Sequence, residues 1–352
     1  MHLRTAALVA LLGASPPSFA QTLQTGNVFN PNISAIGDFL ASTGHNEVNP
    51  MPSLALHEAE IGLQAIVDPY ARGDFFFTFG TESGDVGVEE AYITFLNLPG
   101  EFLLKAGKLK GAFGKLNTQH LHTRLFADVP LPMQNLLGSE DGIDDSGISI
   151  SHLIPAPAGI FLEGTAQLFR GTNENLFYAY TRSDVEPLFH LKGYGDLSES
   201  SNVEIGGSWT RGSNLQGPGY HTTLGGLDAT FRWKPLRQGL YRSLIVQAEF
   251  YLSEQQMPGG TVRANGFYAL AQYQLGRRWF AGYRHDESEH ADNASLRDRG
   301  NSVMVTFWPS EFSQIRAQWR QVRYELTTGT SPASELILQL QFSIGAHGAH
   351  AF

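Results

Sequence analysis

The chain of 352 residues contains no cysteine, and only 16% of its residues are charged. The absence of cysteine excludes a disulfide framework and thiolate chemistry. Beyond the first twenty residues, no apolar stretch approaches the roughly 20 residues that a transmembrane helix needs. There is also no linker-like run of proline, serine or repeated charge, and no shift in composition that would separate two cores. We therefore predict a single domain after the N-terminal segment.

The first twenty residues differ from the rest of the chain. Arg4 supplies a positive charge, residues 5–12 are apolar, and the small residues Ser18 and Ala20 precede Gln21. This order is typical of a secretory signal peptide, so we predict that residues 1–20 are removed and that the mature chain begins near Gln21. A buried N-terminal helix is the alternative. On the first interpretation, residues 21–352 form an exported protein.

Apolar and polar residues alternate from about residue 32 to residue 344. In the last run, Leu336, Leu338 and Leu340 alternate with Ile337 and Gln339. A period of two indicates a β-strand with one apolar and one polar face. Runs of this kind, bounded by turn-forming residues, predict sixteen strands. They cover residues 32–42, 55–67, 72–82, 87–97, 101–114, 145–154, 160–170, 187–197, 202–212, 221–234, 241–254, 264–276, 278–287, 301–308, 312–326 and 335–345.

The connections predict which strand ends lie together. Those after even-numbered strands are tight, whereas those after odd-numbered strands are mostly longer. Tight examples are residues 68–70, 98–100 and 309–311, and longer ones are residues 45–53, 255–263 and 286–300. Short turns at one end and long loops at the other are typical of outer-membrane barrels. We assign residues 174–184 to a loop, because counting them as a strand would reverse this rule halfway along the chain.

The two faces of the strands favour a membrane barrel over a soluble β-sandwich. One face is apolar, as at Val303 and Phe307, and the other is polar, as at Gln314 and Gln318. In a sandwich the apolar faces pack together, whereas in a barrel they face lipid. Sixteen long strands, an export signal and loops of unequal length lead us to predict an all-β protein. We expect a single antiparallel transmembrane β-barrel of the cell outer membrane, surrounded by lipids, with both termini periplasmic.

A barrel of sixteen strands is too wide for side chains to fill, so we predict a water-filled channel for small hydrophilic solutes or ions. Acids on the first four strands and arginines later in the chain would occupy different arcs of the wall. Separated arcs orient dipolar solutes, whereas a ring of one sign selects ions. A charged face without a role in selectivity is the alternative. The candidate constriction residues are Lys105, Lys108, His120, His122, Arg124, Arg316, Arg320, Glu58 and Glu90.

Histidines give a weak signal for metal binding. His120 and His122 would lie on one face of a strand, and His285 and His290 enclose three acidic residues. Zinc binds such nitrogen and oxygen ligands, but a site needs three or four converging donors. No window of the sequence has the spacing of a zinc motif. Metal binding at these four histidines is therefore a hypothesis, and we predict no cofactor.

The sequence carries no G-x-S-x-G elbow, no H-E-x-x-H and no phosphate-binding glycine loop. We therefore predict that the protein is not an enzyme, and a barrel enzyme of the outer membrane is the alternative. With 34 acids against 24 bases, the charge balance also gives no reason to expect a nucleic-acid partner. After loss of the signal peptide the chain stays acidic, but this alone does not establish a preference for cations.

Three segments resemble the porin superfamily, and most closely the phosphate-selective porins of the O and P type. They are residues 89–95 (EEAYITF), 103–114 (LLKAGKLKGAFG) and 203–209 (VEIGGSW). The resemblance implies a sixteen-stranded channel that assembles as a homotrimer. The longest connection, residues 115–144 after the fifth strand, resembles the porin loop that folds inward and narrows the lumen. Whether it does so here is left open.

The tail, residues 345–352 (GAHGAHAF), resembles that of proteins labelled zinc-regulated TonB-dependent outer membrane receptors. A true receptor of that class needs a plug domain and about 22 strands, for which this chain is too short. The two resemblances together make a channel specific for phosphate, for another anion or for a zinc-linked substrate the main alternative to a general porin.

Overall fold

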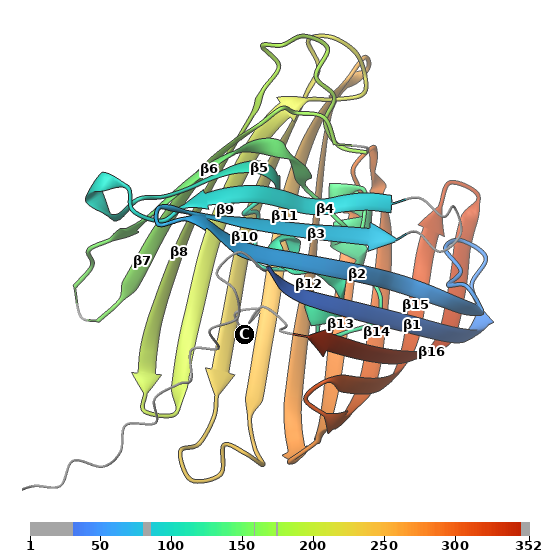
Figure 1. The fold of residues 1–352 in the computed structure, drawn as a ribbon. Coiled ribbons are helices and arrows are strands. Elements are labelled where there is room, and N and C mark those ends of the chain that lie inside the picture. Colours follow the sequence, from blue (N-terminus) through green and yellow to red (C-terminus); the bar gives the residue numbers. More distant parts are fainter. Residues whose placement is uncertain (1–30, 80–85, 158, 174, 346–352) are drawn as a thin grey trace, which may run out of the picture.

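A computed structural model describes residues 31–79, 86–157, 159–173 and 175–345. Sixteen antiparallel strands close into one barrel, in which each strand pairs with its neighbours in sequence and β1 pairs with β16 (Figure 1). The predicted sixteen-stranded all-β barrel is confirmed. The predicted signal peptide and the histidine-containing tail lie outside the described residues.

The strands are β1 (Asn32–His45), β2 (Leu54–Asp68), β3 (Ala71–Phe79), β4 (Val86–Phe95), β5 (Leu103–Lys110), β6 (Asp144–Ile154), β7 (Phe161–Phe169), β8 (Glu186–Ser198), β9 (Ser201–Ser213), β10 (His221–Trp233), β11 (Leu244–Met257), β12 (Gly260–Gly276), β13 (Trp279–His290), β14 (Asn293–Ser310), β15 (Ser313–Leu326) and β16 (Gly329–Gly345). A 3₁₀-helix, η1 (Pro99–Glu101), lies between β4 and β5. Within the described residues, no helix has the length and apolar character needed to cross a membrane.

The outer face of the barrel is apolar and the inner face is polar. Along β16, Leu338 is 47% exposed on the outside, whereas its neighbours Ile337 and Gln339 are buried. Polar residues of the other strands follow the same rule, and Gln314 and Gln318 of β15 are buried inside. Alternation along each strand therefore gives a lipid-compatible exterior and a hydrogen-bonding interior.

The connections after even-numbered strands are short except for residues 234–243, between β10 and β11. The described ends of the chain lie at the same end of the barrel, because Ser34 pairs with Gly345. The predicted long loops at residues 255–263 and 286–300 are wrong. There, β11–β12 and β13–β14 continue as paired strands to tight turns. A run of polar residues does not end a strand when these residues pair with side chains on the neighbouring strand. Arg297, for example, binds the Glu287 carboxylate on the neighbouring strand at 2.6 Å.

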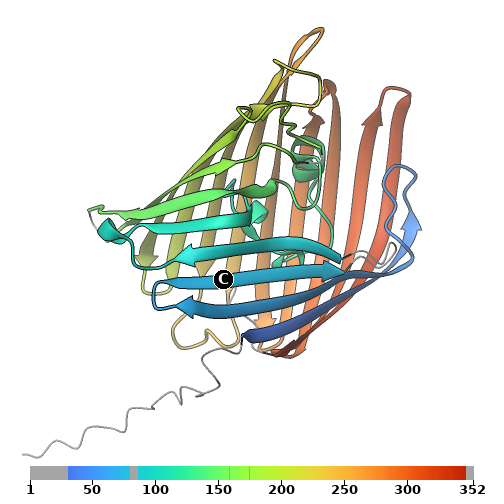
Figure 2. The same ribbon diagram turned by 45° about the horizontal axis from the view of Figure 1, so that its top comes forward.

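The long connection between β5 and β6 folds into the barrel, as Figure 2 shows. We call residues 111–143 the inner loop. It contains two 3₁₀-helices, η2 (Leu116–Thr118) and η3 (Leu121–Thr123), and a π-helical turn, η4 (Met133–Leu137). Its apolar side chains form a buried cluster with Phe177, of the connection between β7 and β8, and with residues of the inner wall. The loop residues are Phe113, Leu116, Phe126, Met133, Leu136, Leu137 and Ile143, and the wall residues are Phe169, Leu188, Leu224, Tyr251 and Tyr268. The loop is thus held by its own hydrophobic core.

The start of the inner loop requires a glycine. Gly114 has a φ of +63°, and a Cβ atom there would lie 2.1 Å from Glu249 Oε2. That carboxylate accepts hydrogen bonds from the backbone N–H groups of Lys115, at 3.0 Å, and Leu116, at 2.8 Å. The glycine therefore lets β11 of the wall satisfy the backbone donors of Lys115 and Leu116, where η2 begins.

Gly114→Ala should lower the free energy of unfolding by at least about 1–2 kcal/mol, because alanine is strained at positive φ and its methyl group would displace Glu249. The measurement is urea-induced unfolding of the refolded barrel in detergent. Gly276→Ala is the matched control, since nothing lies within 4 Å of a Cβ at that position. Equal destabilisation by both substitutions would contradict this account.

Candidate functional site

The inner loop faces an acidic arc of the wall, formed by Glu58 and Glu60 of β2 and by Glu89 and Glu90 of β4. Glu58 and Glu60 of β2 are two residues apart and therefore lie on the same face of the strand. Both are buried inside the barrel. Glu89 and Glu90 of β4 are neighbours, yet both reach the lumen. The register of β3 and β4 shifts between Phe76 and Phe77, which makes a β-bulge at Glu89. The bulge turns inward a side chain that strict alternation would place on the outer face.

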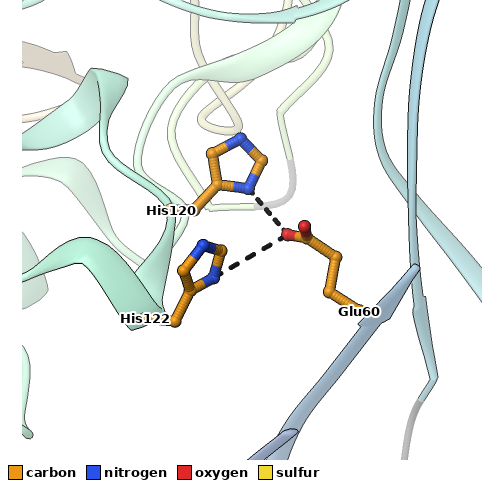
Figure 3. Close-up of side chains that lie close together, drawn as sticks. All are labelled: Glu60, His120 and His122. Atoms are coloured by element: carbon orange, nitrogen blue, oxygen red, sulfur yellow. Dashed lines mark hydrogen bonds and ion pairs between the residues drawn. The ribbon is translucent and has the colours of Figure 1, made fainter. Parts of the chain in front are cut away.

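The two histidines of the inner loop lie against this arc. His120 Nδ1 lies 2.9 Å from Glu60 Oε2 and 3.1 Å from Glu89 Oε2, and its Nε2 lies 3.0 Å from Glu90 Oε2. His122 Nδ1 lies 3.4 Å from Glu58 Oε2 and 3.9 Å from Glu60 Oε2. Figure 3 shows both imidazoles directed at the Glu60 carboxylate. The predicted pairing of the histidines on one face is thus produced by η3 rather than by a strand.

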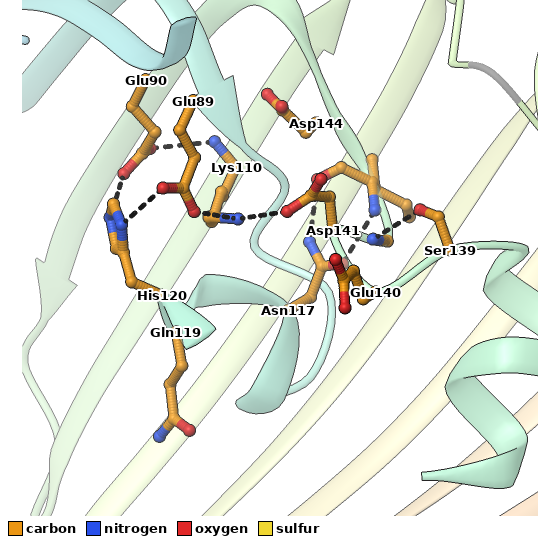
Figure 4. Close-up of polar contacts among 12 residues, drawn as sticks. Glu89, Glu90, Lys110, Asn117, Gln119, His120, Ser139, Glu140, Asp141 and Asp144 are labelled. Carbon is orange, nitrogen blue, oxygen red and sulfur yellow. Dashed lines mark hydrogen bonds and ion pairs between the residues drawn. The ribbon is translucent and has the colours of Figure 1, made fainter. Parts of the chain in front are cut away.

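A lysine extends the same network. Lys110 Nζ lies 2.9 Å from Glu89 Oε1 and 3.5 Å from Asp141 Oδ1, and its backbone N–H donates to Glu90 Oε1 at 3.0 Å (Figure 4). Burial alone would lower the pKa of His120, but its hydrogen bonds to carboxylates of the acidic arc hold that pKa well above 6.5. The histidines of the inner loop are therefore tied directly to β2 and β4, and Asp141, near the other end of the loop, is tied to Glu89 through Lys110 of β5.

A basic arc, on β13 and β15, holds the middle of the loop. Asp128 Oδ2 lies 2.9 Å from Arg284 Nη2 and 3.2 Å from Arg320 Nη1. Arg316 Nη2 donates to the backbone carbonyl oxygen of Arg124 at 3.0 Å. The predicted separation of acids and bases into different arcs therefore exists, and both arcs bind the inner loop: the acidic arc contacts its histidines and the basic arc contacts its aspartate.

The predicted lysines of β5 are placed apart. Lys105 lies opposite Thr94 and Ser149, both buried inside, and its ammonium is 4.5 Å from the centre of the Tyr92 ring. Lys108 has the opposite parity and binds Asp144 Oδ2 at 2.7 Å. The predicted constriction residues therefore divide into the acidic arc with its histidines, the basic arc with Arg124, and Lys105, while Lys108 lies with none of these groups.

Two cavities lie between the inner loop and the wall. The first has a volume of about 420 Å³ and is lined by charges of both signs. These are Lys115, Lys192, Arg232, Glu163, Glu204 and Asp228. The second, of about 360 Å³, is lined by His122, Arg124 and Arg316 together with polar residues of β15 and β16. The loop therefore narrows the lumen and leaves polar space beside it.

Comparison with solved structures places this architecture among known barrels. An anion-selective porin from Comamonas acidovorans has a TM-score of 0.64 at 9% identity, over 89% of this chain and 99% of that one. OprB of Pseudomonas putida has a TM-score of 0.60 at 10% identity, over 90% and 94% of the two chains. The fold is that of an outer-membrane porin. A loop-deletion mutant of OmpT, an outer membrane protein of Vibrio cholerae, is also similar, with a TM-score of 0.58 at 12% identity, over 89% and 99%.

Sequence comparison is less specific. An uncharacterized protein of Aquifex aeolicus is 28% identical over an alignment of 354 positions, covering 88% of this chain and 72% of the relative. No protein-family model matches the chain. The closer resemblance to phosphate-selective porins and the likeness of the tail to receptor proteins therefore stay predictions.

Within the porin fold, the other two candidate metal ligands are not brought to the acidic arc. His285 Nδ1 lies 3.0 Å from Asn301 Oδ1, and His290 Nε2 lies 2.9 Å from Asp298 Oδ2.

The predicted set of constriction residues also omitted residues that the structure brings to the site. Glu60 and Asp128 have a sequence signal, since Glu60 shares the parity of Glu58 and Asp128 lies in the long loop. The omitted residues are Glu60, Glu89, Lys110, Asp128 and Arg284.

Proposed function

We propose that this protein is an outer-membrane channel for the diffusion of small hydrophilic solutes or ions, and that it acts without catalysis. The observation that carries the proposal is the charged cavity of about 420 Å³ between the inner loop and β7–β11. A closed barrel with an apolar exterior provides the membrane part, and a polar interior provides hydrogen-bonding groups that replace the hydration of a solute. The porin fold of the similar structures supports this conclusion.

The remaining features of the proposal follow from the same architecture. Residues 1–20 would direct export and be removed, the outer-membrane lipids would cover the apolar belt, and the end of the barrel at which Ser34 and Gly345 lie would face the periplasm, with both termini on that side. We propose a homotrimer, which light scattering of the detergent-solubilised protein would test. A particle of one chain would remove that part of the proposal and leave the channel itself in place.

We expect weak selectivity between ions. Three bases and three acids line the first cavity, so neither sign of charge dominates it. The arginines of the basic arc bind the inner loop, because Arg284 and Arg320 share Asp128 and Arg316 binds a backbone carbonyl. A general channel is therefore favoured over one specific for phosphate or another anion. Planar-bilayer recordings test this directly: strong selectivity in a salt gradient would favour the substrate-specific alternative, and absence of conductance would reject the channel.

Lys192→Glu should shift the reversal potential toward cation preference. Lys192 lines the first cavity, and the substitution changes its charge by two units. In an aqueous lumen, two charge units about 8 Å from a passing ion change its energy by about 1 kcal/mol, which is roughly a fivefold change in relative permeability. The control is Arg263→Glu, the same type of change at a side chain that is 76% exposed near the β11–β12 turn. An equal shift in both variants would mean that the first cavity does not lie on the ion path.

A further inference from the structure

We propose that the inner loop and the acidic arc together form a binding site for one divalent cation of the zinc type. The ligands are the two histidines of the loop, His120 and His122, with Glu60 and Glu58 of β2. One donor atom each from Glu60, His120 and His122 lies within 4.8 Å of the others, and all three side chains are buried. Figure 3 shows that these donors converge on one point between the loop and the wall.

The chemistry of the donors matches such an ion. Two imidazole nitrogens and two carboxylate oxygens form the mixed set that zinc accepts in tetrahedral sites. Glu58, Glu60 and Glu89 form a second set of donors with the same spacing, so a fourth ligand is available on the wall. Two of the separations between donors are 2.9 Å, for His120 and Glu60, and 3.9 Å, for His122 and Glu60, on either side of the roughly 3.3 Å between donors around a tetrahedral zinc ion, so small side-chain rotations would fit them to an ion.

Unsatisfied oxygens point to a missing partner in this cluster. Within the residues that the structure describes, Glu58 Oε1 and Glu60 Oε1 have no hydrogen-bond partner, and Glu58 Oε2 has only the 3.4 Å contact with His122 Nδ1. Glu58 is 4% exposed and Glu60 is 1% exposed, so water does not replace the missing partners freely. A buried carboxylate without compensation is costly, and a bound cation would remove that cost.

The charged groups around the cluster also favour a bound cation. Four buried carboxylates, those of Glu58, Glu60, Glu89 and Glu90, face the permanent cation of Lys110, with that of Arg124 close by. The carboxylates therefore outnumber the permanent cations at this point, which favours a bound cation. An entry path exists as well, because His122 lines the second cavity, of about 360 Å³.

Such an ion would join residues far apart in the sequence, since Glu58 and Glu60 belong to the wall and the histidines to the inner loop. It would therefore fix the position of the loop that narrows the lumen. The proposal does not depend on conduction, because binding is measured on the full mature protein in detergent. A failure of the channel proposal and a failure of this site are thus separate results.

The test is titration of the protein with ZnCl₂ by calorimetry, with CoCl₂ as a second probe whose visible absorption reports tetrahedral coordination. We expect one ion per chain. The double substitution His120→Asn and His122→Asn should abolish binding, and Glu58→Gln should weaken it by at least the roughly 10- to 100-fold that loss of an outer-shell partner costs. Folding of each variant is checked by its resistance to unfolding in cold SDS, and Glu58→Gln keeps the test decisive if the double variant does not fold.

Two controls separate this site from other histidines. His190→Asn removes a buried luminal histidine that binds Ser208 on the opposite wall, and should leave zinc binding unchanged. The double substitution of His347 and His350 in the tail to Asn should also leave it unchanged. No stoichiometric binding by the natural protein, unchanged binding after loss of His120 and His122, or loss of binding in the tail variant would overturn the proposal.

Discussion

Excision of the inner loop should raise the single-channel conductance several-fold. In the variant we suggest, residues 114–140 are replaced by a short Gly-Ser linker. The ends can be joined without disturbing the wall, because the backbone N–H of Gly111 donates to the carbonyl oxygen of Ile143 at 2.8 Å. A sixteen-stranded barrel without the apolar cluster of the loop has a lumen wide enough for water and hydrated ions. Planar-bilayer recording in symmetric salt measures the change.

The control shortens a connection that contributes nothing to the apolar cluster inside the barrel. Replacing residues 215–219, between β9 and β10, by the same linker should leave the conductance close to that of the natural protein. Both variants are first shown to be folded by their migration in unheated SDS gels. If the folded barrel without the inner loop conducts like the natural protein, the loop does not limit the flow, and the assignment of the constriction to it is wrong.

The barrel could be predicted because the alternation of apolar and polar residues is visible within each strand. In β16, each Leu or Phe of the outer face alternates with a residue of the inner face, and this pattern needs no knowledge of the neighbouring strands. The acidic and basic arcs were also predictable, since Glu58, Arg316 and Arg320 follow the parity of their strands. Placement of residues 174–184 in a connection is likewise consistent with the structure, where residues 175–184 form no strand.

The features that the sequence did not predict depend on contacts between residues that are distant along the chain. Glu89 joins the site only because of a bulge against β3, and alternation in β4 places it on the wrong face. The strand extensions beyond residue 286 depend on pairing between Glu287 and Arg297. Above all, the apolar residues of the inner loop bury themselves against Phe169 and Tyr251 of the wall, and nothing in the loop itself shows that a second core exists inside the barrel.

Asp128→Asn should release the middle of the inner loop from the wall and cost about 1–3 kcal/mol, because it removes the carboxylate that Arg284 and Arg320 share. Each arginine keeps a second carboxylate on the wall, Asp286 for Arg284 and Glu335 for Arg320. Both guanidiniums bind the same Asp128 oxygen, at 2.9 Å and 3.2 Å, and all three side chains are buried. We expect faster proteolysis within residues 111–143 and a lower midpoint of urea unfolding. Asp141→Asn, in the same loop, is the control. Its side chain is 52% exposed, so it should cost less than about 1 kcal/mol.

The difference in the free energy of unfolding between the natural protein and Asp128→Asn should depend on pH, and this provides a second test. Burial alone would raise the pKa of Asp128, but the Arg284 and Arg320 charges outweigh it and hold that pKa below its usual range. A depressed pKa stabilises the folded state above the unfolded value of about 3.9, and the contribution is lost as the pH falls through the folded value. The gap between the natural protein and Asp128→Asn should therefore stay constant from neutral pH down to about 5 and shrink only in stronger acid. A gap that is independent of pH throughout would mean that shape rather than charge at Asp128 holds the loop.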